Sequence, residues 1–145
     1  LVAYCMERKG MRVYGLDRIR SLEITDERFR MPKGFDVDEL FATSFGIYVP
    51  EDKGHTIVFR TTQKEANFLR DLPLHSSQRE LTAAQVRRLA PEYAGDGQVY
   101  FEIFVCPNEA LTMEFCKHGG RLEVLSPASV REAVAAELRK AAEQY

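Results

Sequence analysis

Alternation of apolar and polar side chains opens the chain and predicts two strands, at residues 1–8 and 11–26. Lys9 and Gly10 lie between them and have the composition of a two-residue hairpin turn that needs positive φ. One face of the second predicted strand carries a phenol ring and three guanidinium groups, at Arg12, Tyr14, Leu16, Arg18 and Arg20. Such a face can hold phosphates by bidentate hydrogen bonds and offer a ring for a base to stack on. The alternative is a solvated strand face whose arginine stems cover apolar surface.

A short helix is predicted after these strands. Asp36 is its N-cap, Glu39 completes a capping box, and Phe35 packs against Leu40 as a hydrophobic staple. We expect the helix to end near Gly46.

The chain divides near residues 50–56, because the sequence Pro-Glu-Asp-Lys-Gly at 50–54 has the composition of a linker. Beyond it the patterns predict strands at 56–61, 74–80, 98–105 and 121–125. Helices are predicted after the caps Thr62, Thr82, Asn108 and Ser126. The one after Thr82 is a short helix over 82–90 that Pro91 ends. The order β-α-β-β-α-β with a trailing helix is that of a split βαβ, ferredoxin-like unit.

The same patterns predict which side chains face the core of this second half. The helix after Thr62 points Ala66, Leu69 and Leu72 inward, and the last helix has the stripe Val130, Val134, Leu138 and Ala141. In the strand 98–105, Tyr100 and Glu102 share the face opposite Phe101. An exposed Tyr100 would allow a base-stacking sheet, whereas aromatic residues on the other face are typical of a core.

Composition describes a small protein of one or two compact units, since 145 residues with 45% hydrophobic content can bury a sizeable core. No run approaches the roughly 18 apolar residues of a membrane span. The net charge of −2 argues against a strongly basic nucleic-acid coat. A local basic patch is still possible, because residues 1–33 hold eight Lys or Arg against five Asp or Glu.

Three cysteines, Cys5, Cys106 and Cys116, form no C-x-x-C pair and are read as reduced thiols of a cytoplasmic protein. Cys116 and His118 would lie about 200° apart on a helix and cannot easily share a metal ion. The chain has neither a G-x-S-x-G nor an H-E-x-x-H motif. We therefore expect no enzyme, no cofactor and no metal site.

The strand Arg-Val-Tyr-Gly-Leu-Asp-Arg-Ile at 12–19, after Leu1-Val2-Ala3-Tyr4, resembles the WYL domain of bacterial transcriptional regulators. The chain starts one residue into that family's signature, and we expect it to be a trimmed fragment. The resemblance implies a truncated Sm-like or SH3-like small barrel over 1–52. It also implies a sensor that binds single-stranded nucleic acid or a nucleotide and signals to an N-terminal domain, absent here, that holds operator DNA. The ligand residues that it implies are Arg12, Tyr14 and Arg18, with Tyr4 nearby; Arg20 is added from the strand alternation alone.

The second half, 56–145, resembles the WCX extension that such regulators often carry. The matching pieces are the stretch from Leu74 to Gln78, Gly119 followed by 124–127, and the closing helix. His75, Ser76 and Gln78 form a second candidate patch for ligand phosphates or sugars. The alternative is that these side chains satisfy nearby backbone groups.

The sequence thus predicts an α+β fragment in which a partial barrel precedes a ferredoxin-like unit. Its expected function is ligand sensing and homodimerisation in a transcriptional regulator. The dimer would use the flank Ala133, Ala136 and Ala142 of the last helix. A ligand would close the two halves about residues 50–55. A dimerisation module without ligand and a small-metabolite pocket are the alternatives.

Overall fold

The computed structural model describes residues 1–30, 33–48, 53–93 and 95–145. The chain forms two compact units, Leu1–Phe41 and Ala42–Tyr145, which we call the N-terminal unit and the C-terminal unit. Residues 42–48 therefore belong to the C-terminal unit. The predicted linker residues 50–52 lie outside the described residues, and they are half of the segment 50–55 that is expected to move on ligand binding.

A two-stranded antiparallel sheet makes up the start of the N-terminal unit: β1 (Val2–Cys5) pairs with β2 (Gly10–Val13). The predicted turn was wrong, because Gly10 pairs with Cys5 inside the sheet and the turn precedes it. The positive φ of 48° falls on Lys9. The predicted strand over 11–26 was wrong beyond Val13. No described segment pairs with the chain there, and Leu16–Arg18 instead forms a 3-10 turn, η1.

The helix α1 (Val37–Phe41) begins as predicted. One carboxylate oxygen of Asp36 accepts from the backbone N–H groups of Asp38 at 2.8 Å and Glu39 at 3.2 Å, which confirms the N-cap. The helix ends at Phe41, before the predicted stop at Gly46.

The C-terminal unit contains a four-stranded antiparallel sheet in the order β4-β5-β3-β6. Its strands are β3 (His55–Thr61), β4 (Arg79–Glu80), β5 (Val99–Val105) and β6 (Leu122–Ser126). Its helices are α2 (Gln63–Asp71), α3 (Ala83–Leu89), α4 (Glu109–His118) and α5 (Ala128–Ala142). Two 3-10 turns, η2 (Pro91–Tyr93) and η3 (Gly119–Arg121), connect them.

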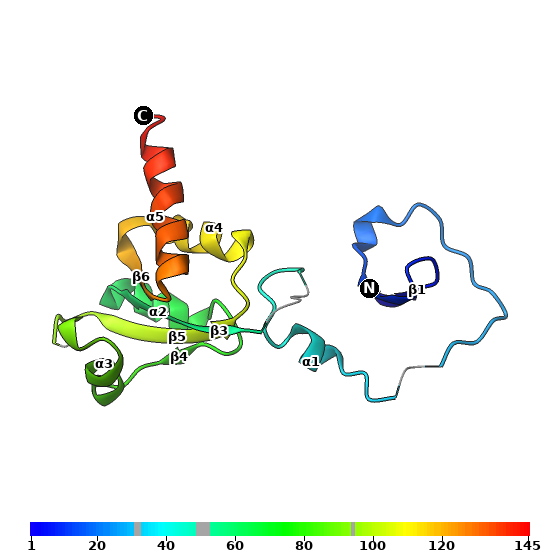
Figure 1. Cartoon of the computed structure of the whole chain (residues 1–145), viewed down its shortest axis with the longest axis horizontal. Helices are drawn as coiled ribbons and strands as arrows, with labels where there is room; N and C mark the ends of the chain where they lie inside the picture. The colour runs from blue at the N-terminus through cyan, green and yellow to red at the C-terminus, as the bar shows by residue number, and fades with distance from the viewer. Residues whose placement is uncertain (31–32, 49–52, 94) are drawn as a thin grey trace. The chain divides into compact units, whose positions relative to one another are not determined.

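The main core lies between one face of this sheet and the helices α2, α4 and α5. Phe59 of β3 is at its centre: its ring stacks on Phe101 at a centroid distance of 5.7 Å and meets Phe115 edge-on at 5.6 Å. Figure 1 shows α4 and α5 on this side of the sheet and α3 on the other. Alternate residues of β3 and β5 face this core, among them Ile57 and Phe59 of β3 and Phe101 and Ile103 of β5.

The other face of the sheet is also covered, by α3. Val86 of α3 and Leu81 pack there with Val58 and Tyr100. The prediction that Tyr100 is exposed was wrong, since only 5% of its surface is accessible. A base-stacking use of Tyr100 on this sheet is thereby excluded.

Three of the four predicted caps of the C-terminal unit are confirmed, and the exception is Ser126. Thr62 accepts from the Glu65 N–H, Thr82 and Gln85 form a reciprocal capping box, and Asn108 accepts from the Leu111 N–H. These local signals worked because each cap is completed within about one turn of chain.

Four further predictions for this unit need correction. Leu72 is 78% exposed, because α2 ends at Asp71. The strand predicted at 74–80 is reduced to Arg79–Glu80. The last helix has Pro127 rather than Ser126 as its N-cap, and its predicted core stripe is buried at Val130 and Val134 but exposed at Leu138 and Ala141.

The fold is therefore mixed, with two antiparallel sheets and five α-helices in the described parts of the chain. None of the helices there is long and apolar enough to cross a membrane.

Candidate ligand-binding site

The N-terminal unit has an open hollow of about 600 Å³ beside β1, β2 and η1. Tyr4, Tyr14 and Arg18 are among its lining residues. Tyr14 is held there by the backbone, because its N–H donates to the Leu1 carbonyl at 2.8 Å and its carbonyl accepts from the Leu1 nitrogen at 3.0 Å. Three of the side chains predicted for ligand binding thus line one hollow.

The chemistry of this hollow combines aromatic rings with a cation. Tyr4 is 54% exposed and Tyr14 41% exposed, so both rings are accessible to a planar group. A guanidinium such as that of Arg18 forms bidentate hydrogen bonds with phosphate or carboxylate. Such an arrangement can stack one or two bases and bind an adjacent phosphate.

A thiol lies in the same hollow. The side chains of Tyr14 and Cys5 interact, and this interaction lowers the pKa of the Cys5 thiol and raises the pKa of Tyr14. Cys5 was interpreted from the sequence only as a small hydrophobe. Cys5 belongs to this hollow because β1, which contains it, pairs with β2, and Tyr14 directly follows β2.

Arg12 and Arg20 are not among the lining residues of this hollow. Arg12 is exposed in β2 and its guanidinium donates to the Met11 carbonyl at 3.3 Å. The predicted single strand face of Arg12, Tyr14, Arg18 and Arg20 was wrong, because the strand stops at Val13 and η1 turns the chain.

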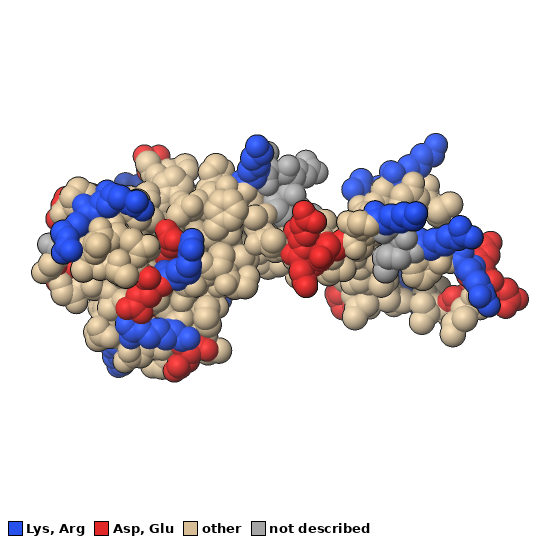
Figure 2. Space-filling view, turned by 90° about the horizontal axis from the view of Figure 1, so that it is seen from below, with Lys and Arg blue, Asp and Glu red and all other residues tan. Residues whose placement is uncertain are grey.

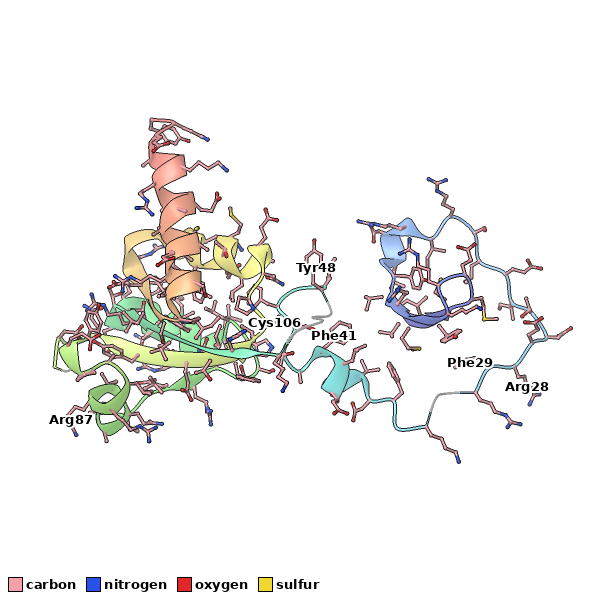
Figure 3. The ribbon with its side chains drawn as sticks, viewed as in Figure 1. Arg28, Phe29, Phe41, Tyr48, Arg87 and Cys106 are labelled. Atoms are coloured by element: carbon pink, nitrogen blue, oxygen red, sulfur yellow. The ribbon has the colours of Figure 1, made fainter. Side chains whose placement is uncertain are left out.

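Sequence reasoning missed a second, mainly apolar hollow of about 730 Å³ in the N-terminal unit. Tyr4 lines it too, together with Met11, Phe29 and Arg30. The available signal was the Arg28-Phe29-Arg30 stretch, an aromatic residue between two cations. Figure 3 labels Arg28 and Phe29 on this part of the chain, and Phe29 is 83% exposed.

The second predicted patch lies in the C-terminal unit, where two of its three side chains bind the protein itself. The Gln78 amide accepts from the Leu74 N–H at 2.9 Å and donates to the Leu69 carbonyl at 2.7 Å. The His75 Nδ1 accepts from the Ser77 N–H at 3.2 Å. Burial lowers the pKa of His75, and a hydrogen bond to the Ser44 backbone partly offsets this. Ser76 is exposed.

Charged groups of the C-terminal unit also pair with one another. Arg60 binds Asp96 at 2.7 Å and Glu123 at 2.6 Å, and lies 4.3 Å from the ring centroid of Tyr93. Glu65 accepts from His118 at 2.7 Å. On the face that Figure 2 shows, basic and acidic side chains of this unit are interspersed. The N-terminal hollow therefore remains the better candidate for an anionic ligand.

Comparison with known proteins assigns a family to the C-terminal part of the chain. The model of the WCX domain family matches residues 53–142. The chain belongs to the WCX domain family. The match covers the part of the chain for which a WCX resemblance was predicted. The WYL resemblance of residues 1–52 stays a prediction.

Other comparisons add little. No curated protein matches the chain. Among solved structures, the chain is similar to proteasome accessory factor B/C (PafBC) of Arthrobacter aurescens, with 24% identity and a TM-score of 0.44. The similarity covers 99% of this chain and 20% of that one, so this chain spans about a fifth of the PafBC chain.

Proposed function

We propose that this chain is the ligand-sensing and dimerisation region of a bacterial transcriptional regulator, and that its N-terminal unit binds single-stranded nucleic acid or a nucleotide. The observation that carries the proposal is the hollow in which Tyr4, Tyr14 and Arg18 come together. WCX membership and the WYL-like sequence at 12–19 support the regulator context.

The expected affinity comes from two kinds of contact. A base stacked on an aromatic ring contributes about 1–3 kcal/mol, so the two tyrosines suit two adjacent bases. Arg18 would bind the phosphate between them, and Arg12 and Arg20 would add long-range attraction. Cytoplasmic location, a non-enzymatic role and independence of cofactors are part of this proposal.

For the C-terminal unit we propose a ferredoxin-like fold. Numbered along this unit, its strand order β4-β5-β3-β6 is 2-3-1-4 with all neighbours antiparallel, which fits a split βαβ arrangement. For the N-terminal unit we propose part of an Sm-like barrel, whose β1 and β2 hairpin would be completed by further strands.

Dimerisation belongs to the same proposal. The flank of α5 presents exposed alanines at 133, 136 and 142, which allow a second helix to approach closely. A dimer would present two DNA-binding domains to two operator half-sites. Light scattering that finds only monomers at every concentration of this chain would contradict it.

The binding proposal is tested with fluorescently labelled single-stranded DNA and RNA of about ten nucleotides, within the usual site size of such modules. We expect Arg18→Ala to weaken binding by about tenfold or more, since a charge-assisted phosphate contact is lost. Arg87→Ala, on α3 of the other unit, is the matched control and should bind as the wild type does.

Salt dependence separates the alternatives. Binding to phosphates weakens steeply as salt is added, because counterions are released. A small-metabolite pocket would bind neither oligonucleotide, and a pure dimerisation module would show only self-association. His75→Ala in the same assay tests the predicted second patch: unchanged affinity would restrict the ligand to the N-terminal unit.

A further inference from the structure

The strand β4 is much shorter than the edge of β5 that it pairs with. Arg79 pairs with Glu102 and Glu80 with Phe101, and the Leu81 N–H donates to the Tyr100 carbonyl at 2.8 Å. Along two antiparallel strands, opposite residues alternate between hydrogen-bonded pairs, which exchange two backbone hydrogen bonds, and non-bonded pairs, which exchange none. Continued in this register, Ser77 would lie at the bonded position opposite Phe104, and His75 at the next one, opposite Cys106.

Ser77 already occupies the ladder position of Phe104, but with its side chain. Its hydroxyl oxygen accepts from the Phe104 N–H at 2.8 Å and donates to the Phe104 carbonyl at 3.2 Å. These are the two groups that a paired strand residue would bind with its own backbone. The hydroxyl thus substitutes for a residue of the ladder.

The next ladder position is occupied by another segment. The Cys106 N–H donates to the Thr43 carbonyl at 2.8 Å, and the Asn108 amide donates to the Phe45 carbonyl at 2.9 Å. Figure 3 labels Cys106 beyond β5 and Tyr48 on the segment 42–48. This segment is the one that follows the last residue of the N-terminal unit, Phe41.

Side-chain contacts hold the intervening residues in a turn. Gln78 binds the backbone of Leu74 and Leu69, and the His75 ring bridges the Ser77 N–H and the Ser44 backbone. All of these contacts join a side chain to a main-chain group. None of them is needed to form an extended strand, which is held by backbone hydrogen bonds alone.

The alternation of side chains permits the longer strand. Arg79 points to the face of Glu102, which it binds at 2.9 Å, whereas Glu80 points to the α2 face and binds Arg70 at 2.8 Å. With period two, Leu74 would lie on the same face as Glu80. Leu74 packs against the α2 side of the core already, so extension would leave it there.

We propose that residues 75–78 are a two-state switch at the edge of β5. In one state, the observed turn, Ser77 and Thr43 cover Phe104 and Cys106. In the other, β4 extends from His75 to Glu80, its backbone binds Phe104 and Cys106, and Thr43 is displaced. Extension of β4 and attachment of the segment 42–45 therefore exclude each other, which couples the sheet edge to the connection with the N-terminal unit. The switch requires no ligand and is independent of the proposed function.

Residue-resolved amide exchange by NMR on the complete, ligand-free chain tests the switch. Ser77→Val removes the hydroxyl and adds a strand-favouring side chain, and we expect it to slow exchange at the amides of residues 75 and 77 by about tenfold or more. A close Hα–Hα contact between Ser76 and Val105 should appear, as in a non-bonded pair. Ser76→Val, which keeps the hydroxyl of Ser77, is the control and should resemble the wild type. Faster exchange at 75–78 without that contact would show that Ser77 only supports the turn, and would overturn the proposal.

A disulfide trap provides the second measurement. In the extended strand, residue 75 and Cys106 would be a bonded pair with Cα atoms about 5.5 Å apart, within the range that a disulfide spans. In a Cys5→Ser, Cys116→Ala background, His75→Cys should therefore form a disulfide with Cys106, and proteolysis within 42–48 should accelerate. Ser76→Cys in the same background is the control, because residue 76 would lie on the opposite face. No disulfide in the His75→Cys protein, or one without faster cleavage, would contradict the exclusion.

Discussion

The two units of this chain differ in how much of their apolar surface they bury. Phe59, Ile57 and Ile103 of the C-terminal unit are completely inaccessible, whereas Ile24 and Phe29 of the N-terminal unit are 95% and 83% exposed. None of the described residues in 1–30 and 33–41 is buried. A two-stranded hairpin is marginally stable alone, so we expect the stability of the chain to reside in the C-terminal unit, whereas the proposed ligand-binding surface lies in the N-terminal unit.

The largest expected effect tests where the stability resides. Phe59→Ala removes the ring that contacts both Phe101 and Phe115, and should lower the free energy of unfolding by about 3–5 kcal/mol. Ile24→Ala in the N-terminal unit should change it by less than about 0.5 kcal/mol. Urea unfolding followed by circular dichroism measures both. Equal losses would mean that the N-terminal unit is part of the same cooperative core.

A smaller effect is expected from Glu65 of the C-terminal unit. Glu65 binds His118 at 2.7 Å and Arg121 at 3.4 Å, and its side chain is 12% exposed. Glu65→Ala leaves the His118 imidazole, which is 14% exposed, without this hydrogen-bond partner and should cost about 1–3 kcal/mol. Glu132→Ala on the exposed surface of α5 is the control. A loss no larger than that of Glu132→Ala would show that the pair is dispensable.

Helix caps allow a direct comparison between the units. Asn108→Ala removes the cap of α4 and should cost about 1 kcal/mol in the same urea experiment. Asp36→Ala removes the equivalent cap of α1 and should leave the unfolding free energy unchanged, because α1 contributes no buried residue. If Asp36→Ala destabilises the chain as much as Asn108→Ala does, α1 unfolds cooperatively with the C-terminal unit.

The smallest expected effect concerns Tyr100, whose hydroxyl donates to Asp96 at 2.7 Å. Burial, followed by this hydrogen bond, raises the pKa of Tyr100 from 10.0 to about 12. Because the folded pKa is the higher one, this contribution is complete below pH 10 and is lost as the pH rises to 12. Tyr100→Phe should cost about 1 kcal/mol at neutral pH and flatten the alkaline decline of stability. The same decline in Tyr100→Phe would assign it to other groups.

Local chemistry predicted much of the C-terminal unit. The caps at Thr62, Thr82 and Asn108 were found because a cap and its partner lie in one turn of the chain. The core face of β5, with Phe101 and Ile103, was found because alternation with period two places these residues on one side of the strand. The exposure of Tyr100 was predicted wrongly, since α3, which covers it, is distant in sequence from the sheet face that it packs against.

The candidate site was only partly readable from the sequence. Tyr4, Tyr14 and Arg18 were identified, but through a strand that does not continue past Val13. Alternation specifies a strand only where a partner strand supplies hydrogen bonds, and in the described N-terminal unit β1 gives β2 such a partner over four residues. Cys5 and the hollow near Phe29 depend on folded geometry that no spacing in the sequence encodes.

The sequence by itself determined the starts of the helices capped by Asp36, Thr62, Thr82 and Asn108, the identity of the core strands and the WCX-like order of elements. These follow from interactions within a few residues or from a fixed period. Only the tertiary structure decided where strands end and which polar side chains are used internally. Gln78 and Ser77 illustrate the reason. Their donors and acceptors are satisfied by Leu69 and Phe104, which come close only after the chain has folded.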